Sequence, residues 1–176
     1  MCARYCSQAA LLALLLGLAL GQSYENDWDQ PLDFSCPEGQ LISYVNSYHS
    51  NYYEDRRWRF YCRNANYGAV TSCEWTSDYV NDWDGALSYM CPENMALAGV
   101  ASVHSNYYED RRLKFKCCGH AGYKMDSCIL TGELHAPDKE LKYFVPDGSV
   151  LGGWVSEHFD VSEDRIHRMI VCKFNK

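Results

Sequence analysis

Two stretches of the chain, 55 residues apart, combine basic, acidic and aromatic residues and end in cysteine. The first reads HSNYYEDRRWRFYC over residues 49–62, and the second reads HSNYYEDRRLKFKCC over residues 104–118. A planar guanidinium group matches the oxygens of sulfate and carboxylate, and neighbouring aromatic rings can stack on sugar faces. The strings therefore suggest the binding of anionic carbohydrate. The candidate ligand-binding residues are Arg57, Arg59, Arg112, Lys114 and Lys116.

The acid and the first arginine of each string have a second interpretation. An acid–arginine pair can lock the turn that precedes a strand, which makes these side chains structural. We predict this role for them and for a weaker third copy of the motif; the residues are Asp55, Arg56, Asp110, Arg111, Asp164 and Arg165. The basic residues that follow are freer to bind a ligand, and a merely solvated strand face is the alternative.

The residues that follow the acid alternate as in a half-buried strand. Trp58, Phe60 and Cys62 share one face, whereas Arg57 and Arg59 share the other. Turn-forming Pro-Glu-Gly, Pro-Glu-Asn and Pro-Asp-Gly triplets precede segments rich in β-branched and small residues. No stretch shows a helical period, so we expect an all-β fold.

The strings belong to a longer internal duplication. Residues 26–63 and 81–118 share 21 identities in 38 aligned positions. A weaker third copy places Pro146 opposite Pro92 at an offset of 54. The chain is therefore interpreted as three internal repeats of about 55 residues, at about 26–80, 81–135 and 136–176, with pseudo-threefold symmetry.

The first 21 residues are typical of a secretory signal peptide. Arg4 precedes an apolar run that is too short to span a bilayer, and small residues follow it. Cleavage after Gly21 leaves one domain, residues 22–176, which we expect to be secreted to the extracellular space or matrix without membrane insertion. Removal of Arg4 changes the formal charge from −7 to −8. This acidic balance argues against nucleic acid as a partner.

Ten cysteines minus the two in the signal leave eight, and an even number in a secreted chain favours four disulfides. Eight cysteines allow 105 connectivities. The spacing from Cys73 to Cys117 equals that from Cys128 to Cys172, both being 44 residues, and repeat symmetry favours the pairing built on this equality. The predicted bridges are Cys36–Cys62, Cys73–Cys117, Cys91–Cys118 and Cys128–Cys172.

Two repeated tryptophans and one Cys-Cys-Gly-His sequence raise other possibilities. Trp28 and Trp83 could stack on carbohydrate, but a repeated tryptophan more often packs in a core or between repeats, which is the role we expect. The aspartates beside them supply too few ligands for a calcium loop. Disulfides are favoured over zinc for Cys117 and Cys118. We predict no metal and no cofactor.

Repeated Asp-Arg-x-aromatic-x-Phe strands ending in cysteine, Cys-Pro turns, a Cys-Cys pair and many tyrosines resemble the dermatopontin family, including its hemagglutinin and amebocyte aggregation-factor branch. The segment DRRWRF at 55–60 matches strongly, DRRLKF at 110–115 replaces the aromatic with Leu113, and DRIHRM at 164–169 matches weakly. The resemblance covers the chain from Tyr24 to Lys176. It implies an extracellular-matrix protein that binds decorin-like proteoglycan, collagen and the cell surface, and it agrees with the predicted disulfide pairing.

We therefore expect a non-enzymatic adhesion protein, because the chain carries no Gly-x-Ser-x-Gly, His-Glu-x-x-His or Walker sequence. It is expected to bind glycosaminoglycan-bearing proteoglycans and collagen and to assist matrix assembly. The alternative is a lectin-like hemagglutinin or cell-aggregation factor of innate defence, and a weaker one is a structural protein of a mineralised or fibrous matrix. The sequence leaves a homo-oligomer open.

Overall fold

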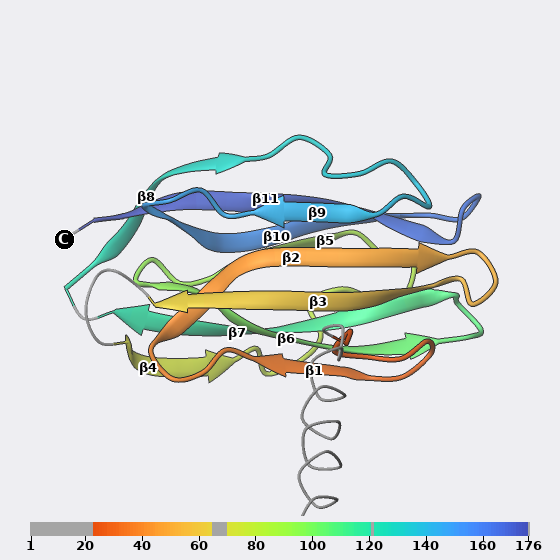
Figure 1. Cartoon of the computed structure of the whole chain (residues 1–176), viewed down its shortest axis with the longest axis horizontal. Coiled ribbons are helices and arrows are strands. Elements are labelled where there is room, and N and C mark those ends of the chain that lie inside the picture. Colours follow the sequence, from red (N-terminus) through yellow and green to blue (C-terminus); the bar gives the residue numbers. More distant parts are fainter. Residues whose placement is uncertain (1–22, 65–69, 121, 176) are drawn as a thin grey trace, which may run out of the picture.

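The computed structural model describes residues 23–64, 70–120 and 122–175 (Figure 1). Within these ranges the chain forms eleven strands and no helix, which confirms the all-β expectation. The predicted signal peptide lies outside the described residues. The strands are β1 (Leu32–Ser35), β2 (Gln40–Ser50), β3 (Asp55–Asn64), β4 (Val70–Trp75), β5 (Leu87–Met90), β6 (Met95–Ser105), β7 (Asp110–His120), β8 (Lys124–Leu130), β9 (Leu141–Phe144), β10 (Ser149–Phe159) and β11 (Asp164–Asn175).

The strands make three antiparallel sheets, ordered β1-β6-β7-β4, β5-β10-β11-β8 and β3-β2-β9. In each sheet a long hairpin is flanked by a short strand from another part of the chain. β1 pairs with β6, β5 with β10, and β9 with β2, so the last third of the chain returns to complete the sheet of the first. The sheets are interlocked, and no third of the chain completes a sheet by itself.

The first strand of each long hairpin contains a register shift at a corresponding position. The shifts lie between Ile42 and Tyr44, between Leu97 and Gly99, and between Leu151 and Gly153. A Cβ atom at Gly153 would collide with the backbone oxygen of Tyr89 on β5, so glycine lets the short strand approach. These bulges bend the hairpins and allow them to enclose a common core.

The turns of the three long hairpins gather at one end of the molecule, on the right of Figure 1. We call this the turn end; it consists of residues 51–54, 106–109 and 160–163, between β2 and β3, β6 and β7, and β10 and β11. One cavity is lined by residues from all three hairpins, including the glutamate that ends each turn. Side chains that are far apart in the sequence therefore meet here.

The core holds aromatic side chains from all three hairpins. The rings of Trp58 and Trp154 lie 5.5 Å apart between centroids, and Phe115 lies 5.6 Å from Trp154. The indole Nε1 of Trp154 donates to Nδ1 of His167 at 2.9 Å. Burial, followed by the nearby charge of Arg56, holds the pKa of His167 well below its usual value, so this histidine stays neutral. A neutral imidazole lets the core remain apolar around the tryptophan.

Candidate functional site

Six charged side chains just beneath the turn end form a closed set of ion pairs, which we call the Asp–Arg ring. Its members are Asp55, Arg56, Asp110, Arg111, Asp164 and Arg165, all of them buried. Each arginine donates from Nε and Nη2 to both oxygens of one aspartate, at 2.6 and 2.7 Å. Arg56 pairs with Asp164, Arg111 with Asp55, and Arg165 with Asp110. The structural role predicted for these residues is therefore seen, but each arginine pairs with an aspartate of a different hairpin.

The remaining hydrogen-bonding groups of the ring are also occupied. The Arg111 guanidinium donates to the hydroxyl of Ser102 at 2.9 Å and to the carbonyl of Gln30 at 2.9 Å. The backbone N–H of Asp29 donates to Asp55 at 2.8 Å. Burial alone would raise the pKa of Asp55, but neighbouring His104 and Arg111 favour the ionised form and lower it to about 2. The ring is a satisfied structural network, and it is not free to bind a ligand.

The basic residues that follow the ring lie on the surface beside aromatic side chains. In the first string, Arg57 lies over the rings of Tyr24 and Trp28, with its guanidinium carbon 4.7 and 5.5 Å from the ring centroids. Trp28 stacks on Tyr53 with centroids 5.3 Å apart and planes 8° apart. The guanidinium of Arg59 lies 4.7 Å from the Tyr24 centroid. We call these five residues platform 1.

The second string builds the same arrangement, which we call platform 2. Arg112 lies 4.4 Å from the ring centroid of Tyr79 and 5.2 Å from that of Trp83. Trp83 stacks on Tyr108 with centroids 5.4 Å apart and planes 6° apart. Lys114 lies 5.0 Å from the Tyr79 centroid. Each member of platform 2 stands 55 residues after its counterpart in platform 1.

The third hairpin does not carry this arrangement. Aligned at the offset of 54, Pro137 stands where Trp83 would be, Ile166 where Arg112 would be, and Ser162 where Tyr108 would be. Arg168, the counterpart of Lys114, instead pairs with Glu133 at 3.0 Å. Among the described residues, the chain therefore has two platforms rather than three.

Four of the five predicted ligand-binding residues lie in the platforms: Arg57 and Arg59 in the first, Arg112 and Lys114 in the second. Lys116 lies further along β7, half-buried and opposite Trp75 of β4, outside platform 2. None of the five is shown to bind a ligand, so this part of the prediction stays a prediction.

The tryptophans lie elsewhere than expected. Trp28 and Trp83 are half-buried surface residues stacked on tyrosines, not core residues. Sequence reasoning also missed Tyr53 and Tyr108 as their partners. The signal available was that all four residues repeat between the first two copies and are absent from the third.

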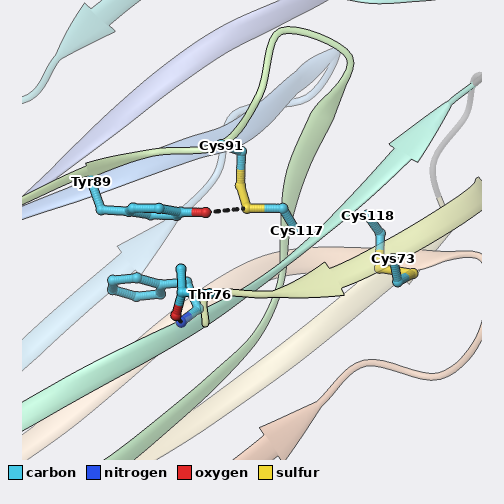
Figure 2. The surroundings of a disulfide bond; sticks show 7 residues. Cys73, Thr76, Tyr89, Cys91, Cys117 and Cys118 are labelled. Carbon is cyan, nitrogen blue, oxygen red and sulfur yellow. Dashed lines mark hydrogen bonds between the residues drawn. A yellow bond between two sulfur atoms is a disulfide. The ribbon is translucent and has the colours of Figure 1, made fainter. Parts of the chain in front are cut away.

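The structure contains four disulfides, and two of them differ from the prediction. Cys36–Cys62 and Cys128–Cys172 are present as expected. The pairs Cys73–Cys117 and Cys91–Cys118 are wrong, because Cys73 bonds to Cys118 and Cys91 bonds to Cys117. Figure 2 shows the two adjacent bridges, with the hydroxyl of Tyr89 3.2 Å from the sulfur of Cys117.

The alternation of β7 explains this correction. Cys117 and Cys118 are neighbours on one strand, so their side chains point to opposite faces. Cys118 lies opposite Cys73 in the pairing of β7 with β4, whereas Cys117 points into the core, where Cys91 also lies. The sequence did carry the signal, since Cys91 and Cys117 each stand 55 residues after Cys36 and Cys62. The equal spacings of 44 residues were a coincidence, because the third copy is shifted by 54.

Fold and site together define a disulfide-stabilised all-β protein with two surface platforms of aromatic and basic residues. The family model described as Dermatopontin matches residues 26–176. The chain is 38% identical over 169 residues to the hemagglutinin/amebocyte aggregation factor of Limulus polyphemus, covering 95% of this chain and 96% of that protein. It is 38% identical to dermatopontin of Biomphalaria glabrata, covering 86% of this chain and all of that protein. It is 26% identical to human dermatopontin over 84% of this chain and 75% of that protein.

The chain therefore belongs to the dermatopontin family. No solved structure matches it. The four disulfides and this family membership fit an extracellular protein. No helix that is long and apolar enough to cross a membrane occurs in the part of the chain that the structure describes.

Proposed function

We propose that this protein is a secreted, non-enzymatic matrix and adhesion protein that binds sulfated glycosaminoglycan chains through platforms 1 and 2. The observation that carries the proposal is the duplication of one surface arrangement on one rigid body. A guanidinium group held against an aromatic ring keeps its planar fork available for a sulfate, and the indole offers a face for a sugar ring. Two such sites let one molecule bridge two chains, which raises avidity without a strong single site.

Membership of the dermatopontin family supports the matrix role, with decorin-like proteoglycan and collagen as the partners and matrix assembly as the outcome. The pseudo-threefold arrangement of the three repeats is part of the proposal; the cyclic pairing of the Asp–Arg ring supports it. It explains why the scaffold is repeated three times, whereas the platforms are repeated only twice.

A second candidate is a lectin-like factor that aggregates cells. The 38% identity to the Limulus hemagglutinin/amebocyte aggregation factor, over nearly the full length of both chains, favours it. The two candidates differ in what the platforms recognise. Binding of a sulfated chain depends on the basic groups and weakens with salt, whereas binding of a neutral sugar depends on the aromatic faces and is inhibited by that sugar.

The test compares binding with bridging. The mature protein and the variants Arg57→Ala, Arg112→Ala and the double variant are passed over immobilised dermatan sulfate across a salt series, and are mixed with dermatan-sulfate-coated beads. Each single variant is expected to bind but to lose bead clumping, and the double variant to lose both. Arg168→Ala is the matched control, because it changes the counterpart of Lys114 on the hairpin without a platform.

Binding and clumping by a correctly folded double variant at wild-type levels would contradict the platform proposal. Clumping of erythrocytes that a simple sugar inhibits and salt leaves unchanged would favour the second candidate. Correct folding is checked by near-ultraviolet circular dichroism, which reports the buried tryptophans.

A further inference from the structure

Three histidines lie buried at the turn end with ring nitrogens that lack hydrogen-bond partners. They are His49 on β2, His104 on β6 and His158 on β10, and only 1% of each side chain is exposed. Both ring nitrogens of His49 and of His104, and Nε2 of His158, make no hydrogen bond. An unsatisfied buried polar group costs about 1–3 kcal/mol, and its recurrence in one place points to a bound ion or water.

His49 and His158 each lie between two carboxylates. Nδ1 of His49 is 3.5 Å from Asp138, and Nε2 is 3.9 Å from Glu54. Nδ1 of His158 is 3.8 Å from Asp84, and Nε2 is 3.6 Å from Glu163. In both cases Nδ1 faces an aspartate contributed by another part of the chain, and Nε2 faces the glutamate that ends the hairpin turn.

This order of groups is the one that metal-binding histidines use. A ligating imidazole usually holds its other ring nitrogen against a carboxylate, which fixes the ring and raises its basicity. Two ligands of one tetrahedral zinc ion at about 2.0–2.1 Å lie roughly 3.3 Å apart. The separations of 3.6 and 3.9 Å between Nε2 and the glutamate oxygens exceed that by a few tenths of an ångström. Glu54 and Glu163 are partly exposed, so they can close this gap.

The charges around the cavity favour a cation. The three ring arginines are each taken up by an aspartate. In the ranges that the structure describes, no lysine or arginine lies within ion-pair distance of Glu54, Glu109 or Glu163. Burial raises the pKa of Glu54; His49 lowers it, and the carboxylates of Glu109 and Glu163 raise it further, so the three turn glutamates share one region of negative potential.

The cavity has room for an ion. Its volume of about 30 Å³ is enough for an ion with a water molecule, and its lining includes the three histidines and the three turn glutamates. A different group, His49 with Asp138 and Asp164, also brings three ligand atoms within 4.8 Å. It is the poorer site, because both oxygens of Asp164 already accept hydrogen bonds from Arg56.

We propose that the turn end binds one divalent transition-metal ion, with zinc as the expected metal, through Nε2 of His49 and His158 and the carboxylates of Glu54 and Glu163. Asp138 and Asp84 hold the two imidazoles in position. Nitrogen and oxygen donors in this combination suit zinc, whereas calcium takes six to eight oxygens. The ion would tie the first hairpin to the third at the end where their turns meet. This site is separate from the platforms, and its failure would leave the proposed function untouched.

Metal uptake by the oxidised mature protein tests the proposal. The protein is first treated with a chelator and then titrated with Zn²⁺ against a chromophoric competitor; Co²⁺ replaces zinc for absorption spectra. We expect one ion per chain, visible absorption bands of tetrahedral cobalt, and a rise in the thermal midpoint with zinc. The double variant Glu54→Gln, Glu163→Gln should bind at least tenfold more weakly and should lose the thermal shift.

Glu93→Gln is the matched control, since Glu93 is exposed and lies outside the turn end, and it should bind like the wild type. Glutamine keeps the shape of glutamate, so both variants should fold. No uptake at micromolar zinc, or equal uptake by the double variant, would overturn the proposal. So would proton NMR of the metal-free protein showing His49 and His158 doubly protonated at neutral pH, because protons would then fill the role assigned to the ion.

Discussion

Replacing Arg111 with methionine probes the Asp–Arg ring directly. The change keeps the length of the side chain but removes both donors to Asp55, which are 2.6 and 2.7 Å from its oxygens. Breaking a buried ion pair by removing one partner costs about 3–5 kcal/mol, because the other charge is left buried. Total stabilities of about 5–15 kcal/mol make this a large fraction, and the thermal midpoint should fall by roughly 6–20 °C.

The cost should also depend on pH in a defined direction. In the native protein the pKa of Asp55 is about 2, below the unfolded value of about 3.9, so its contribution is present above pH 4 and is lost as the pH falls towards 2. Without Arg111, burial dominates and raises the folded pKa, so the carboxyl group takes up a proton on folding. The difference in unfolding free energy between wild type and variant is therefore largest at pH 7 and shrinks as the pH falls to about 4.

The assay is unfolding in guanidinium chloride with the disulfides intact, followed by fluorescence of the buried tryptophans at pH 7 and pH 4.5. Arg168→Met is the control, because Arg168 pairs with Glu133 and Glu157 on the surface, where ion pairs contribute little. If Arg111→Met cost no more than Arg168→Met at pH 7, or if its cost grew on acidification, the ring would not have the stabilising role assigned to it.

Two further predictions concern the scaffold. Gly153→Ala should destabilise the protein by several kcal/mol, since its Cβ would strike the backbone of β5, whereas Gly132→Ala, with nothing within 4 Å, should leave the unfolding midpoint unchanged; equal midpoints would refute the close-approach argument. Mild reduction of the folded protein, followed by alkylation and peptide mapping, should open Cys73–Cys118 before Cys91–Cys117, because Cys73 is exposed and both sulfurs of the second bridge are in residues that are buried; the reverse order would contradict the burial described.

The parts of the structure that could be predicted from the sequence are those that local pattern controls. The alternation of apolar and basic residues after Asp55 correctly places Trp58 and Phe60 inside and Arg57 at the surface. The absence of a helical period correctly excluded helices from the described residues. In each case the period of two, which the pleated strand imposes, leaves only one arrangement that buries the apolar face.

The parts that could not be predicted depend on which distant segments meet. Arg111 pairs with Asp55, 56 residues away, rather than with an acid of its own string. A repeat in the sequence shows that the copies have equivalent contacts, but it does not show whether an arginine turns to its own copy or to the next. Trp28 was misplaced for a related reason, since a large aromatic ring suits a core and a surface stack equally well.

The exchange of short strands between hairpins makes the molecule tolerant of a broken backbone. A proteolytic cut in the connection between β8 and β9 would sever the chain, yet β2 would still pair with β9, β5 with β10, and β8 with β11 across the cut. Cys128–Cys172 and the ion pair between Arg56 and Asp164 span it as well. A nicked molecule therefore remains a single particle and keeps both platforms, which is an advantage for a cross-linker that works among extracellular proteases.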